Sequence, residues 1–102
     1  MSELQSVVIR VTIGDNLTCS FPDGNEVSSL KGKARFENFT QLSAEVHFSN
    51  SDTVIELAPE EAKVFDLKEL KEPGDHRFSI HEVKDGEVDP TVYGEGGIII
   101  RA

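Results

Sequence analysis

Apolar and polar residues alternate with a period of two along most of the chain. Such alternation is typical of β-strands with one buried face, because successive side chains of a strand point to opposite faces. The clearest case is the run from residue 42 to residue 49, whose apolar members are Leu42, Ala44, Val46 and Phe48. Shorter runs of this kind cover residues 7–13, 17–21, 53–57, 63–67, 76–83 and 98–100. The pattern therefore predicts about seven short strands.

Turn-forming residues separate these runs. Pro73-Gly74 has the residues of a tight turn, and Asp85-Gly86 suits a two-residue hairpin. Helical signals are confined to single turns at Glu60–Lys63 and Lys68–Lys71, and the stretch Gly32–Gln41 is too mixed to assign. Short strands with regular turns favour an all-β fold, a single immunoglobulin-like β-sandwich that spans residues 1–102.

The alternation also predicts which side chains form the core. A slip of one residue would turn every side chain of a strand to the other face, so this prediction depends on correct parity. The predicted core consists of Val7, Ile9, Val11, Ile13, Leu17, Cys19, Phe21, Leu42, Val46, Phe48, Val54, Phe65, Phe78 and Ile80.

Acidic residues outnumber basic ones, with 19 Asp and Glu against 10 Lys and Arg and a formal net charge of -9. This charge disfavours nucleic acid and anionic membranes as partners and leaves a protein with a basic surface, or a cation, open. No run approaches the roughly 20 apolar residues of a membrane span, and the first residues lack a signal peptide. We expect a cytoplasmic chain as written, or a domain taken from a larger surface protein, with no membrane insertion.

Residues with catalytic or metal-binding chemistry are few. His47, His76 and His81 have no metal-ligand spacing, and two of them fall on the polar faces of their strands, so we interpret them as surface histidines. The single cysteine, Cys19, alternates with apolar neighbours and is expected to be a small buried residue. The glycine-rich stretch 94–97 indicates a bulge or a close approach of strands. Without a nucleophile, base or cofactor motif, we predict no enzyme activity and no cofactor.

Glu82 is out of place in the strand HRFSIHEV. Phe78 and Ile80 share one face, and the next position on that face holds the carboxylate of Glu82. An ionised carboxylate in a core costs several kcal/mol unless it is paired. Three explanations stay open. Either the strand ends there and Glu82 reaches water, or Glu82 pairs with a buried Lys or Arg, or Glu82 is an acid positioned in the core for a chemical role.

The segment PGDHRFSIHEV, followed by DPTVY and an apolar last strand, resembles the isopeptide-forming pilin domains of Gram-positive surface proteins. The resemblance covers about 35 residues. It implies an immunoglobulin-like sandwich with a structural role, in which Glu82 occupies the position of the Glu that promotes an amide bond between a core Lys and an Asn. Residues 7–13 contain no Lys and residues 98–102 contain no Asn, so we expect the structural role without the cross-link.

The expected function is therefore that of a non-enzymatic structural or protein-interaction domain whose partner is another protein. One alternative is a small acidic inhibitor or nucleic-acid mimic that binds the basic groove of a target protein. Another is a virion or filament accessory protein that assembles through an exposed strand edge at Ile98, Ile99 and Ile100. The sequence does not set the oligomeric state.

Overall fold

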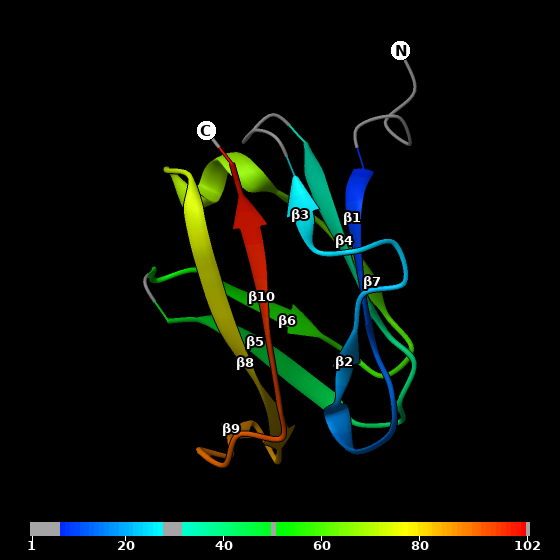
Figure 1. Ribbon diagram of the computed structural model, residues 1–102. Helices are drawn as coiled ribbons and strands as arrows, with labels where there is room; N and C mark the ends of the chain where they lie inside the picture. The colour runs from blue at the N-terminus through cyan, green and yellow to red at the C-terminus, as the bar shows by residue number, and fades with distance from the viewer. Residues whose placement is uncertain (1–6, 28–31, 50, 102) are drawn as a thin grey trace.

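The computed structural model describes residues 7–27, 32–49 and 51–101, and these form two β-sheets packed face to face (Figure 1). The strands are β1 (Val7–Ile13), β2 (Cys19–Ser20), β3 (Glu26–Val27), β4 (Lys33–Asn38), β5 (Ser43–Phe48), β6 (Val54–Leu57), β7 (Ala62–Asp66), β8 (Gly74–Lys84), β9 (Glu87–Val88) and β10 (Gly94–Ile100). The predicted all-β sandwich is confirmed. Seven of the strands described have four or more residues, and β2, β3 and β9 have two each.

The smaller sheet has the order β2-β1-β4-β7, and the larger one has the order β3-β10-β8-β5-β6 with β9 paired to β8. Two of the pairings are parallel, β1 with β4 and β3 with β10, and the others are antiparallel. The predicted Asp85-Gly86 hairpin joins β8 to β9, with positive φ at both turn residues. This turn geometry is the one that Asp-Gly favours.

The core lies between the sheets and is centred on Phe36, whose ring contacts those of Phe48, Phe65 and Phe78. Phe36 belongs to β4, in the stretch that the sequence pattern left unassigned. Burial in β4 alternates strictly, so Ala34, Phe36 and Asn38 point inward. A small residue and a polar residue at inward positions explain why the apolar signal of this strand is weak.

Most of the predicted core residues are buried, and two predictions are wrong. Val54 is 45% exposed because Ile55 and Leu57 are the inward residues of β6, one position away from the predicted parity. Leu42 is 37% exposed because it precedes β5 and lies in the turn after β4. Cys19 and Phe21 are partly buried against the core. The side chain of Val7 lies outside the described residues.

The last strand is not an exposed edge, which corrects the expectation for Ile98, Ile99 and Ile100. Ile98 and Ile100 point into the core and are buried. The pair Ile99–Ile100 lies between β3 on one side and β8 on the other. Ile98 and Ile100 therefore fill the sandwich, Ile99 is half-buried on the other face, and the pair Ile99–Ile100 is not a free strand edge.

Helical structure in the described ranges is limited to two 3-10 turns, η2 (Asp15–Leu17) and η3 (Leu67–Leu70). The second overlaps the predicted turn at Lys68–Lys71 and is capped by Asp66, whose Oδ1 accepts the backbone N–H of Lys68 at 3.1 Å. In the ranges that the structure covers, no helix has the length and apolar character needed to cross a membrane.

Candidate functional site

Two of the three histidines lie side by side on the outer face of the larger sheet. In the pairing of β5 with β8, Glu45 is opposite His81 and His47 is opposite Ser79, so the two imidazoles are diagonal neighbours. Their ring centroids are 4.9 Å apart. Both rings face away from the core because Val46 and Ile80, their neighbours in the chain, point inward.

The hydrogen bonds of His81 determine its tautomer. Its Nδ1 lies 3.0 Å from the carbonyl oxygen of Asp89 and 3.0 Å from that of Thr91. Carbonyl oxygens only accept, so Nδ1 carries the proton. In the neutral ring the lone pair is then on Nε2, which accepts the hydroxyl of Ser79 at 2.8 Å.

His47 is oriented in a similar way by a carboxylate. Its Nε2 lies 2.9 Å from Oε1 of Glu45, whose side chain is only 15% exposed. Because the carboxylate accepts, Nε2 carries the proton and the lone pair of the neutral ring is on Nδ1. Each imidazole thus donates one N–H to oxygen atoms of the protein, and the second nitrogen, Nδ1 of His47 or Nε2 of His81, carries the lone pair, which in His81 accepts the Ser79 hydroxyl.

Further carboxylates surround this histidine pair. Glu56 of β6 is opposite Glu45, and Glu95 of β10 is opposite Ser79, so both lie on the same outer face. Negative groups around the two imidazoles raise the local concentration of cations. The site therefore suits a positively charged ligand.

A short segment after β9 covers His81 from one side. Asp89 Oδ1 accepts the N–H of Thr91, and Asp89 Oδ2 accepts the hydroxyl of Tyr93, both at 2.9 Å. These two bonds, the backbone one first, lower the pKa of the Asp89 carboxyl. The same bond to Asp89 raises the pKa of Tyr93, because only the neutral phenol can donate it.

Glu82 is half-buried at the end of the inward row of β8, opposite Ala44. After the contribution of Asp89, the negative charge of Glu82 adds to the raised pKa of Tyr93, so the two side chains are neighbours. The buried polar or charged residues of the described chain are Asn38 and His76. No buried lysine therefore accompanies Glu82 in this part of the chain, as an amide cross-link would need.

The remaining histidine, His76, is buried in the core and apart from the other two. Its Nε2 lies 2.7 Å from the carbonyl oxygen of Glu72, and its buried Nδ1 has no hydrogen-bond partner. The ring is thus held by the chain that precedes β8. It is not the surface residue that the sequence suggested.

Cys19 is half-buried, and its Sγ lies 3.1 Å from the carbonyl oxygen of Glu95. Burial raises the pKa of the thiol, so less thiolate is present near neutral pH than for a free cysteine.

We expect alkylation of Cys19 by iodoacetamide at pH 7 to be slower than that of glutathione, and faster after unfolding in urea. Equal rates for the folded chain and glutathione would contradict this placement of the thiol.

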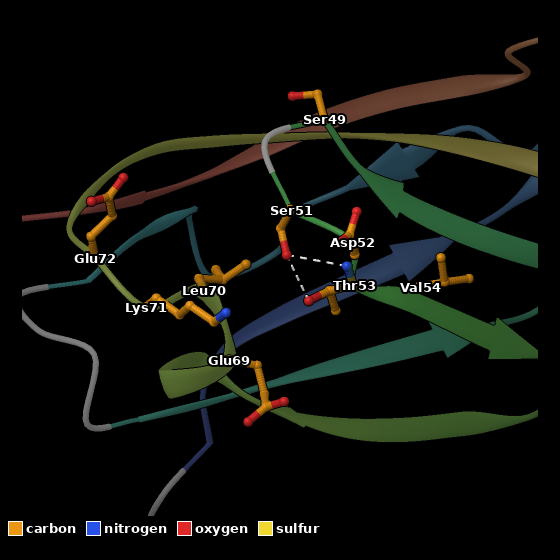
Figure 2. Close-up of a pocket in the computed structure, with 9 residues that line it drawn as sticks. All are labelled: Ser49, Ser51, Asp52, Thr53, Val54, Glu69, Leu70, Lys71 and Glu72. Carbon is orange, nitrogen blue, oxygen red and sulfur yellow. Dashed lines mark hydrogen bonds between the residues drawn. The ribbon is translucent and has the colours of Figure 1, made fainter.

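An open pocket lies between the β5–β6 connection and η3 (Figure 2). Its acidic side chains, Asp52, Glu69 and Glu72, point in different directions. Ser51 instead makes local bonds, accepting the N–H of Thr53 at 3.1 Å and contacting its hydroxyl at 2.8 Å. Across the described ranges, no group of three or more His, Cys, Asp or Glu residues could hold a metal ion.

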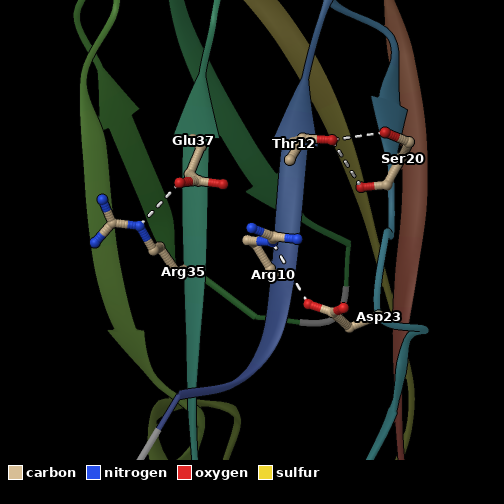
Figure 3. A network of polar contacts seen from close by, with 6 residues as sticks. All are labelled: Arg10, Thr12, Ser20, Asp23, Arg35 and Glu37. Atoms are coloured by element: carbon tan, nitrogen blue, oxygen red, sulfur yellow. Dashed lines mark hydrogen bonds and ion pairs between the residues drawn. The ribbon is translucent and has the colours of Figure 1, made fainter. Parts of the chain in front are cut away.

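The outer face of the smaller sheet carries paired polar groups (Figure 3). Arg35 Nε lies 3.0 Å from Glu37 Oε2, Arg10 Nε lies 3.5 Å from Asp23 Oδ2, and the hydroxyls of Thr12 and Ser20 are 2.6 Å apart. Exposed pairs of this kind contribute little to stability. This face supports strand register and offers no convergent site.

No family model and no curated protein matches the chain. Several solved structures share its fold, and all those compared below are of amicyanin variants. A methionine-to-glutamine variant with Cu(I) is 12% identical, with a TM-score of 0.58 over 99% of this chain and 90% of that chain. A methionine-to-alanine variant with Cu(I) is 13% identical, with a TM-score of 0.57 and the same coverage. An oxidised methionine-to-leucine variant is 13% identical, with a TM-score of 0.56 over 95% of this chain and 83% of that chain.

These matches correct the function expected from the sequence. The fold is a β-sandwich similar to that of the structures named above, which are amicyanins and not pilin modules. The expectation of a pilin-like structural or interaction domain is therefore wrong. The same finding overturns the two alternatives, which were an acidic inhibitor and an edge-assembling accessory protein.

A thiolate copper centre does not fit the residues described. Such a centre needs two imidazoles and a cysteine thiolate around one ion, with a weak axial ligand such as methionine. Cys19 packs against the core, whereas His47 and His81 lie on the outer face, with the larger sheet between them. His76 points inward, but its Nε2 is already bound to the Glu72 carbonyl. The donors that such a centre would require are thus on different sides of the larger sheet.

Proposed function

We propose that the chain is a non-enzymatic domain that binds a divalent transition-metal ion on the outer face of the larger sheet, through His47 and His81. The orientation of the two rings carries the proposal. Imidazoles that ligate metals usually donate their other N–H to a carboxylate or a backbone carbonyl, which fixes the tautomer and the ring. Glu45 has this role for His47, and the carbonyls of Asp89 and Thr91 have it for His81.

The ligand set favours Cu(II) over Zn(II). Imidazole nitrogens suit both ions, and for a given site of nitrogen and oxygen ligands the affinity for Cu(II) is the higher. The nitrogens that carry the lone pairs are Nδ1 of His47 and Nε2 of His81, and the ion would replace the Ser79 hydroxyl at the second. Two protein ligands leave positions for water, so the expected site is open and labile.

The test is calorimetric titration of the full chain with CuCl2 and, separately, ZnCl2. We expect His47→Asn and His81→Asn each to lower the affinity about tenfold or more, since each removes one of two nitrogen ligands, an effect at least as large as the loss of an outer-shell partner. Thr12→Asn, on the outer face of the smaller sheet, is the matched control and should bind as the unaltered chain does (Figure 3).

Nuclear magnetic resonance locates the ion independently. Substoichiometric Cu(II) should broaden the amide signals around His47 and His81 and leave those of β1 and β4 sharp. If the double variant His47→Asn/His81→Asn binds Zn(II) as tightly as the unaltered chain, or if the broadening lies elsewhere, the proposed site is wrong.

A further inference from the structure

We infer that residues 89–93, here called the clasp, hold His81 in the tautomer and orientation needed for metal binding, with Asp89 as the positioning residue. This inference rests on the proposed function and names the device that prepares its site. Asp89 and Tyr93 do not touch the lone-pair nitrogen of His81 in the structure. They act through the backbone carbonyls that accept its other N–H.

The clasp is fixed to β8 on both sides of His81. The N–H of Asp89 donates to the carbonyl of Glu82 at 2.8 Å, and the N–H of Tyr93 donates to the carbonyl of Ile80 at 2.9 Å. Glu82 and Ile80 are the two chain neighbours of His81. The clasp therefore bridges over the His81 side chain, which places its carbonyl oxygens beside the ring.

The Asp89 carboxylate shapes the turn within the clasp. One oxygen accepts the N–H of Thr91 and the other accepts the hydroxyl of Tyr93. Pro90 lies between Asp89 and Thr91, and its ring fixes φ. Together these restraints aim two carbonyl oxygens, those of Asp89 and Thr91, at the single Nδ1 of His81.

Two acceptors on Nδ1 specify where the ring carries its proton. If the turn loosens, His81 can adopt the other neutral tautomer, which places the proton on Nε2 and removes the lone pair from the side that Ser79 faces. Changes to groups that orient metal-ligating histidines typically lower metal affinity 10- to 100-fold. We therefore expect the clasp to control affinity without contributing a ligand.

The experiment compares Asp89→Ala, Asp89→Asn and Tyr93→Phe in the full chain. Nitrogen-15 spectra of the metal-free protein report the His81 tautomer, and titration with ZnCl2 reports affinity. Asp89→Ala should mix the tautomers and lower Zn(II) affinity about tenfold. Asp89→Asn keeps an oxygen acceptor for Thr91 and should restore both readouts to within about threefold of the unaltered chain.

Two results distinguish a failure of the clasp inference from a failure of the proposed function. If the unaltered chain does not bind zinc, the metal site is refuted, while the tautomer spectra still show whether the clasp sets the His81 tautomer. An Nδ1–H tautomer and a zinc affinity both unchanged in Asp89→Ala would overturn the inference. Should Asp89→Ala unfold, Tyr93→Phe removes the hydroxyl restraint alone, and an unaltered tautomer and zinc affinity in Tyr93→Phe would overturn the positioning role.

Discussion

Replacing Gly94 by alanine is expected to lower the free energy of unfolding by about 3 kcal/mol, the upper part of the usual range for inserting an atom into a packed core. A Cβ at this position would clash with the carbonyl oxygen of Leu17 and would lie 3.3 Å from the Cα of Thr18. Both contacts are with backbone, so neither can be relieved by turning a side chain. β10 and η2 can approach as they do only because residue 94 has no side chain.

Gly97→Ala is the matched control, because Gly97 belongs to the same strand. Its nearest contact would be Oδ1 of Asp75 at 3.2 Å, the end of a side chain that can move. Urea denaturation of the two variants under the same conditions measures the difference. A Gly94→Ala variant as stable as Gly97→Ala would mean that β10 and η2 are not packed as closely as the structure has them.

The alternation of apolar residues was sufficient to predict the fold class, because in a strand with one buried face every second side chain points to the core and is usually apolar. It failed where inward residues are not large and apolar. β4 was missed since its inward positions hold Ala34 and Asn38 beside Phe36. In β6 two apolar residues are adjacent, Val54 and Ile55, so the pattern alone did not decide which of them points inward.

Sheet order and register are a different problem from strand parity. The sequence shows that His47 and His81 lie on the polar faces of their strands, and this was the signal available. It does not show that β5 pairs with β8, or that the register makes the two histidines diagonal neighbours. The clasp was equally hidden, although its Asp-Pro pair does mark a turn. Long-range pairing creates the site, and short-range patterns do not record it.

The same limit explains why the sequence did not reveal the likeness to amicyanin. Many β-sandwiches present short alternating strands, and they differ in how the strands are paired and connected across the two sheets. Here β1 and β4 pair in parallel, as do β3 and β10. No local pattern distinguishes a parallel neighbour from an antiparallel one in strands of this length. The amicyanin likeness was visible only from the arrangement in space.

Asn38→Leu is expected to cost about 3 kcal/mol of stability, because it removes the four hydrogen bonds that a buried amide makes to two turns. The Asn38 side chain is 1% exposed. Its Nδ2 donates to the carbonyls of Leu42 and Ala58 at 2.8 and 3.1 Å, and its Oδ1 accepts the N–H and the hydroxyl of Thr40 at 3.0 and 2.7 Å. One amide therefore joins the β4–β5 turn to the β6–β7 turn, which belong to different parts of the sandwich.

Leucine has the branched shape of asparagine but is larger and apolar, so its methyl groups take the positions of the amide atoms without their hydrogen bonds. The expected loss therefore combines the missing hydrogen bonds with some overpacking of the core. Gln41→Leu, at an exposed position of the same turn, is the control and should change stability by less than about 0.5 kcal/mol. Thermal and urea denaturation of the two variants provide the measurement. If Asn38→Leu were as stable as the control, the two turns would not depend on this amide. Water would then have replaced Asn38 as the hydrogen-bond partner of the Leu42 and Ala58 carbonyls.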